Sequence, residues 1–254
     1  MMQPSRRSKL IFVMTMGLGT SLGASVAHAG YKDGLTLVRQ GKWDQATKEF
    51  DDMAALGHAP SQFSLALINH LGRGVPRNLK KAYDLYKQSA VQNHPPALNN
   101  LGMMYLNGEY VAVNRKIAFK LFSKAGADHA QAKDNLGQCY ENGWGVEPDI
   151  EQAVNFFKLA GDEGYRLGYY HLGQLHEEGR GGAPVNIPEA MKWYQIAGEA
   201  TFARGYHRLG EMYEQGIGVP RDVKQAISWY EQAGALGYEP AITKVRKMKL
   251  GEGG

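Results

Sequence analysis

One pattern recurs five times along this 254-residue chain and constrains its fold more than any other feature. A leucine followed by alanine or glycine returns every 35 to 37 residues, and a glycine stands seven positions after each leucine. The leucines are Leu65, Leu101, Leu136, Leu172 and Leu209, and the glycines are Gly72, Gly108, Gly143, Gly179 and Gly216. Glycine is suited to the left-handed end of a helix. The pattern therefore predicts one helix per repeat that begins before the leucine and ends at the glycine.

A second set of residues marks the other half of each repeat. An alanine stands 17 or 18 residues beyond each leucine, and an aromatic residue follows it by four positions, on the same face of a helix. These pairs are Ala82 and Tyr86, Ala118 and Phe122, Ala153 and Phe157, Ala190 and Tyr194, and Ala226 and Tyr230. Four residues before the alanines stand Asn78, Asn114, Asp149, Asn186 and Asp222, which are favoured N-cap types. Each repeat is therefore predicted to contain helix A, a glycine-rich turn and helix B.

These residues resemble the SEL-one-like repeat (SLR) family, a branch of the tetratricopeptide-like superfamily with a longer loop between its helices. The last repeat carries the pattern most fully, in Leu209-Gly210, Tyr213, Gly216-Ile217-Gly218-Val219-Pro220, Asp222, Ala226, Trp229-Tyr230 and Ala233. The resemblance implies an all-α fold, a right-handed α-solenoid of about five repeats. Their expected bounds are 59–94, 95–129, 130–165, 166–202 and 203–238. Residues 30–58 resemble a tetratricopeptide unit and are expected to form an N-terminal cap, and residues 239–254 a C-terminal capping helix and tail.

The first 29 residues have the pattern of a cleaved signal peptide. Arg6, Arg7 and Lys9 precede an uncharged stretch of 17 residues, which ends before Ala27-His28-Ala29. That small-x-small triplet predicts cleavage before Gly30. The alternative, an uncleaved membrane anchor, is less favoured because a spanning helix needs about 20 predominantly apolar residues. We expect a periplasmic protein, or else a secreted one, and the sequence does not distinguish general secretion from twin-arginine export.

Removing the signal segment changes the charge balance. The formal net charge of +4 falls to +1 because the segment holds three basic and no acidic residues. The remaining chain has no contiguous run of like charges, so nothing in its charge predicts binding to nucleic acid. It also has no second apolar stretch long enough to cross a membrane.

No catalytic or cofactor-binding constellation is evident. Cys139 is the only cysteine, which excludes an intramolecular disulfide and a cysteine-rich metal site. His171 and His176 are five residues apart, unlike the i, i+4 pair of a zinc helix, and His176 occupies the position held by tyrosine in three other repeats. We predict a packed structural histidine, a small buried cysteine, no cofactor, no metal and no enzymatic activity. Some cysteine-rich relatives have been assigned β-lactam hydrolysis, but the paired cysteines of those repeats are missing here.

The surface predicted to bind a partner is the helix A face, because the superfamily resemblance implies that helix A lines the concave side of the solenoid. The positions two before and two after each repeat leucine should face a partner. They are Asn99, Met103, Asp134, Gln138, Tyr170, Gln174, His207 and Glu211. Glu141, Glu177 and Glu214 follow on the same helices. Because acidic residues predominate, a basic or neutral segment is the expected ligand.

The predicted function is therefore a non-enzymatic protein-protein interaction module, a scaffold or adaptor of the bacterial cell envelope. Its expected partners are proteins or extended peptides. A periplasmic regulator that sequesters a sensor or signalling partner is the alternative, and a β-lactamase-like hydrolase is a weaker one. Neither the oligomeric state nor the identity of the partner follows from the sequence.

Overall fold

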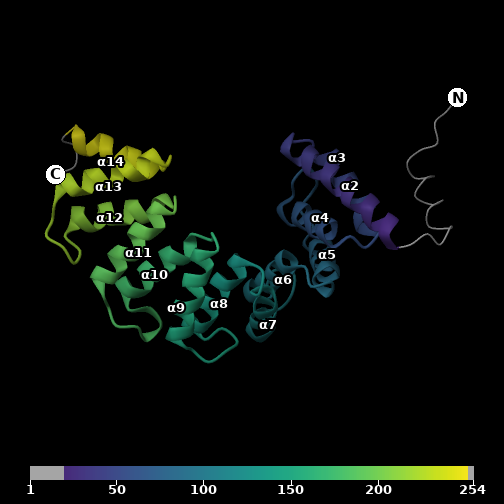
Figure 1. The fold of residues 1–254 in the computed structure, drawn as a ribbon, viewed down its shortest axis with the longest axis horizontal. Helices are drawn as coiled ribbons and strands as arrows, with labels where there is room; N and C mark the ends of the chain where they lie inside the picture. The colour runs from purple at the N-terminus through teal and green to yellow at the C-terminus, as the bar shows by residue number, and fades with distance from the viewer. Residues whose placement is uncertain (1–19, 251–254) are drawn as a thin grey trace. The chain divides into compact units, whose positions relative to one another are not determined.

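The computed structural model describes residues 20–250, with side chains from His28 onward, and this part of the chain contains thirteen α-helices and no β-strand (Figure 1). The predicted all-α solenoid fold is confirmed. Residues 1–19, which hold most of the predicted signal segment, lie outside the described residues. The chain divides into two compact units between Val113 and Asn114.

The first unit is a series of helices in which each packs against the next. They are α2 (Thr20–Arg39), α3 (Trp43–Ala55), α4 (Ala59–Leu71), α5 (Leu79–Val91) and α6 (Pro95–Asn107). In α2, His28 and Ala29 are exposed, whereas Gly30 is buried against the side chain of Met53 in α3. Gly34 approaches Phe50 in the same way. Gly30 and Gly34 therefore both take part in the packing of α2 onto α3.

The second unit continues the same alternation of helices A and B. It contains α7 (Arg115–Ala125), α8 (Ala130–Asn142), α9 (Ile150–Asp162), α10 (Leu167–Glu178), α11 (Ile187–Glu199), α12 (Ala203–Gln215), α13 (Val223–Ala235) and α14 (Glu239–Lys249), with a 3-10 turn at Arg180–Gly182. From α8 to α14, each helix packs against the one that follows. Side-chain contacts also join α8 to α10, α10 to α12 and α12 to the capping helix α14, so these alternate helices lie side by side.

Helix boundaries fall where the repeat pattern predicts them. All five helices B begin after an Asn or Asp whose side chain accepts a hydrogen bond from a first-turn N–H, as in Asn78 with Lys81 N at 2.9 Å. All five helices A end at a glycine with φ between 65° and 74°. This left-handed conformation is strained for residues with a Cβ atom, which explains the glycine.

The core is made where helices A and B of one repeat cross. Tyr194 and Tyr230 are fully buried beneath Gly173 and Gly210, where a Cβ atom would lie 2.4–2.5 Å from a ring carbon. A close approach of this kind requires glycine. Cys139 is fully buried, as predicted, and burial raises the pKa of its thiol to about 12.

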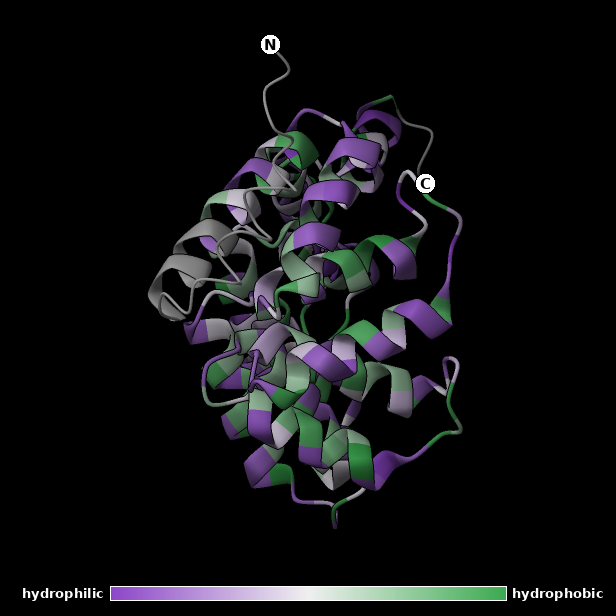
Figure 2. Ribbon diagram, turned by 90° about the vertical axis from the view of Figure 1, so that its right-hand side faces the viewer, coloured by the Kyte–Doolittle hydropathy of each residue, from purple (hydrophilic) through white to green (hydrophobic). Residues whose placement is uncertain are grey.

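Hydrophobic and hydrophilic residues are interleaved along the helices (Figure 2). In the described part of the chain, no helix combines the length and apolar character needed to span a bilayer.

Candidate partner-binding surface

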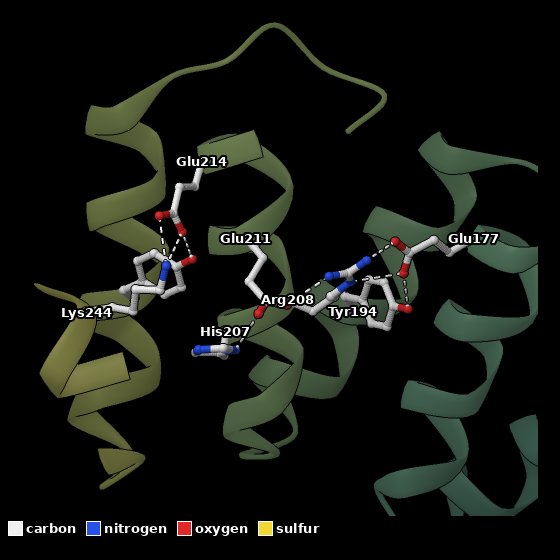
Figure 3. A network of polar contacts seen from close by, with 8 residues as sticks. Glu177, Tyr194, His207, Arg208, Glu211, Glu214 and Lys244 are labelled. Carbon is white, nitrogen blue, oxygen red and sulfur yellow. Dashed lines mark hydrogen bonds and ion pairs between the residues drawn. The ribbon is translucent and has the colours of Figure 1, made fainter. Parts of the chain in front are cut away.

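The helix A face of the second unit carries a network of ion pairs that joins successive repeats (Figure 3). Arg208 begins the network one residue before the leucine of the fifth repeat. Its Nε donates to Glu177 Oε2 of α10 at 3.1 Å, and Nη2 donates to the other carboxylate oxygen. Tyr194 of α11 donates its hydroxyl to Glu177 at 2.6 Å. Burial and this acceptor raise the pKa of Tyr194, so the phenol stays protonated.

The same arrangement returns one repeat later. Lys244 of α14 lies 2.8 Å from both carboxylate oxygens of Glu214, which also accepts a hydrogen bond from Tyr230 at 2.5 Å. Burial alone raises the pKa of Glu214, but the hydrogen bonds from Lys244 and Tyr230 outweigh it, and the pKa lies below its ordinary value. Glu214 is therefore ionised at neutral pH. We call each set of a helix A glutamate, its helix B aromatic residue and the next repeat's cation an inter-repeat joint.

The joint of the third repeat is built differently. Phe157 stands where the later repeats have tyrosine and offers no hydroxyl. Glu141 is buried and pairs instead with Arg180 from the loop of the fourth repeat, Nε to Oε1 at 2.6 Å and Nη2 to Oε2 at 2.9 Å. His171, at the position of Arg208, donates from Nδ1 to Asp134 Oδ1 at 2.8 Å.

Four predicted site residues precede the repeat leucines by two positions, and the structure uses all four in packing. Asn99 and Asp134 are 0% and 1% exposed, so they present no surface to a partner. Tyr170 packs between the rings of Tyr194 and Phe202, with centroids 5.2 and 5.4 Å away. His207 packs in the same way between Tyr230 and Tyr238, at 5.2 and 5.1 Å.

The predicted residues two positions after the leucines are more accessible. Met103, Gln138, Gln174 and Glu211 are all partly exposed. Gln138 donates to Asp134 at 2.9 Å, Gln174 accepts from Arg180 at 3.3 Å, and Glu211 accepts from Arg208 at 2.8 Å. Their side chains are therefore held in place and partly open to solvent.

The sequence prediction missed the cations that pair with three glutamates of this face. Glu141, Glu177 and Glu214 were expected to make it acidic, but they pair with Arg180, Arg208 and Lys244. The sequence held a signal for this pairing. Arg208 stands one residue before the repeat leucine Leu209, and Lys244 stands one residue before Val245 at the corresponding position of α14. The expected ligand was a basic or neutral segment, and the pairing of these three glutamates removes the reason for preferring a basic one. Among the described residues, no group of three histidine, cysteine or acidic side chains is arranged to hold a metal ion.

Comparison with known proteins identifies the repeat. A family model of the Sel1 repeat matches residues 59–94, 95–128, 130–165, 166–202 and 203–238, more than half of the chain. The chain belongs to the Sel1 repeat family. Proteins built from Sel1 repeats are typically protein-interaction modules.

Solved structures of other Sel1 repeat proteins are similar over most of the chain. A Sel1 repeat protein from Oxalobacter formigenes is 27% identical, with a TM-score of 0.72 over 84% of this chain and 87% of that one. A protective antigen present in uropathogenic Escherichia coli strains, also 27% identical, has a TM-score of 0.70 over 92% of this chain and 51% of its own.

A relative found by sequence matches a shorter part of the chain. A putative sel1-like repeat-containing protein of Acanthamoeba polyphaga mimivirus is 34% identical over 74 residues, which cover 29% of this chain and 14% of that relative.

Proposed function

We propose that this Sel1 repeat protein is an exported scaffold or adaptor of the bacterial cell envelope, without enzymatic activity, that binds a protein partner on the helix A face of its second unit. The observation that carries the proposal is the set of partly exposed polar side chains on rigid helices, above all Gln138, Gln174 and Glu211. Hydrogen bonds within the face fix their rotamers, which lowers the entropy cost of binding.

The chemistry of the face favours an uncharged polar segment as the ligand. Glu177 and Glu214 pair with Arg208 and Lys244 within the fold, so neither carboxylate is free to attract a basic partner. Two glutamine amides offer donors and acceptors, and the edges of Tyr170 and His207 add apolar contact. An extended peptide that supplies backbone N–H and C=O groups matches this surface.

Export is supported by the packing of α2. Gly30 contacts Met53 and Gly34 contacts Phe50, so cleavage before Gly30 would leave both of these contacts intact. A structural neighbour that is a protective antigen in Escherichia coli is consistent with a location outside the cytoplasm. Mass spectrometry of the protein purified from its host should find Gly30 as the N-terminus, and recovery of the intact chain in the cytoplasm would contradict export.

Crosslinking in the native envelope tests the face itself. The variant Q138A/Q174A/E211A removes the accessible polar groups while leaving the inter-repeat joints in place. A matched control, Q152A/N155A/Q225A, changes three exposed positions on helices B. We expect recovery of crosslinked partners to fall about tenfold for the first variant and to stay unchanged for the second, because a few residues carry most binding energy. Equal recovery from both variants would exclude this face.

A further inference from the structure

One helix of the second unit has a charge pattern that its role in the fold does not explain. Helix α7 carries four basic residues and no acidic one along its eleven residues. Lys116, Lys120 and Lys124 are spaced at i, i+4 and i+8 and are all exposed. The buried residues of the helix are Ala118, Phe122 and Ala125. At 100° per residue, the three lysines point away from that buried side and form one outward row.

The equivalent rows of the other helices B show that the fold does not need lysine there. Aligned on the repeat alanine, each row contains the residues two before, two after and six after it. The rows are Lys80, Asp84 and Gln88 in α5, Glu151, Asn155 and Leu159 in α9, Pro188, Lys192 and Ile196 in α11, and Lys224, Ser228 and Gln232 in α13. Each has at most one lysine, and Lys80 pairs with Asp84 at 2.7 Å.

The row of α7 is not neutralised within the described part of the chain. No carboxylate there lies within ion-pairing distance of Lys116, Lys120 or Lys124, although Lys158 of α9 pairs with Asp162 and Lys192 of α11 with Glu189. Like charges four residues apart on a helix repel each other. The α7 lysine row therefore lowers the stability of the free protein. An anionic group that approaches the row compensates this repulsion.

We propose that the α7 lysine row binds an acidic segment of a protein partner, on a surface separate from the helix A face. The ammonium groups repeat about every 6 Å along the helix, a spacing that carboxylates four residues apart on a partner helix share. Ile117, 36% exposed beside the row, adds an apolar contact. An anionic membrane is the poorer match, because the equivalent rows of the other helices B hold at most one lysine each and α9 has Glu151 there, so a wide surface would meet little further basic charge.

The test compares two variants of equal charge. K116Q/K120Q/K124Q removes the row, and K80Q/K192Q/K224Q removes one outward lysine from each of three other helices B. The probe is a fluorescein-labelled peptide of ten glutamates, titrated by anisotropy at about 50 mM salt, where screening is weak. We expect the first variant to weaken binding at least tenfold and to flatten the salt dependence, and the control to change affinity less than twofold.

Three results would overturn the proposal. The first is that the wild type does not bind the peptide, and the second is that both variants lose affinity equally. The third is that the protein binds vesicles containing phosphatidylglycerol through the lysine row but does not bind the peptide. The last result would assign the row to a membrane. Removing mutual repulsion leaves folding intact, which circular dichroism of each variant checks. The outcome is independent of the helix A face, because neither variant alters it.

Discussion

Arg208 and Glu177 stand 31 residues apart in the chain and meet through two hydrogen bonds at the boundary between the fourth and fifth repeats. The glutamate side chain is 8% exposed and the arginine side chain 26%. Glu177 therefore depends on Arg208 and Tyr194 for compensation of its charge. The hydrogen bonds that Arg208 donates to Glu177 hold the pKa of Arg208 above its ordinary value, although burial opposes this.

Replacing Arg208 with methionine should destabilise the second unit. The substitution keeps an apolar stem but leaves the buried Glu177 without its cation. Breaking a fully buried ion pair in this way costs about 3–5 kcal/mol. Because Arg208 is partly exposed, we expect a loss of about 2 kcal/mol. Urea unfolding measures it. The double variant E177Q/R208M removes both charges and should recover at least half of the loss. A single variant as stable as the wild type would show that the joint contributes nothing.

Stability should fall on acidification, and His176 should contribute. Burial lowers the pKa of His176 below its ordinary 6.5. Near pH 6 the unfolded chain therefore binds a proton that the folded chain does not, so stability decreases as the pH falls below about 6.5 and levels off below the folded pKa. Burial lowers the pKa of His58, His129 and His207 as well.

The variant H176Y, which restores the residue found in three other repeats, should reduce this dependence. The measurement is the Tm at about pH 7.5 and about pH 5.5, on either side of the ordinary pKa of histidine. The difference between the two Tm values should be smaller for the variant than for the wild type. An unchanged difference would mean that His176 is protonated equally in both states.

Cys139 should be unreactive in the folded protein. With a thiol pKa of about 12 and no exposed surface, roughly one molecule in ten thousand carries a thiolate at pH 8, and the thiolate is the reactive form. Labelling with a maleimide should be at least about a hundred times slower in buffer than in urea. Rapid labelling of native protein would show that α8 opens readily.

Two glycines with positive φ should tolerate alanine differently. A Cβ atom at Gly145 would lie 2.2 Å from the carbonyl oxygen of Arg115, whereas one at Gly164 would meet nothing within 4 Å. We expect Gly164→Ala to cost about 1 kcal/mol, the strain of a left-handed residue. Gly145→Ala should cost at least about 3 kcal/mol, because backbone must also move. Thermal unfolding distinguishes them, and equal losses would refute the close contact.

The fold was predictable because its signals lie within one repeat. The leucine, the glycine and the Asx cap each act within a few residues, and five phased copies reinforced them. Tyr110 shows the limit of this reasoning. It stands nine residues after its leucine, where the other repeats have glycine, and its φ is 67°. Its ring packs on Tyr83 with centroids 5.5 Å apart, a contact between helix B and loop that the period does not indicate.

The candidate site was less predictable because it depends on contacts between repeats. Asn99 and Asp134 occupy the same helical phase as Tyr170 and His207, and phase alone does not show which of them the neighbouring repeat covers. The α7 lysine row escaped a search for contiguous charge, since other residue types separate Lys116, Lys120 and Lys124 in the sequence. Only the helical geometry brings them into one row.

The inter-repeat joints give the order of the repeats a chemical meaning. Glu177 meets Arg208 and Glu214 meets Lys244, so the last two boundaries have the same acid and tyrosine on one side and a cation on the other. A chain that lost the fifth repeat would place Lys244 opposite Glu177 and keep a matched pair. A chain that lost the third would set Arg180 opposite Leu106 and His171 opposite Asn99, and neither of these positions holds a carboxylate. Gains and losses of whole repeats should therefore destabilise the fold less near the C-terminus than in the middle. The C-terminal end is thus where this row of repeats can change its length most easily.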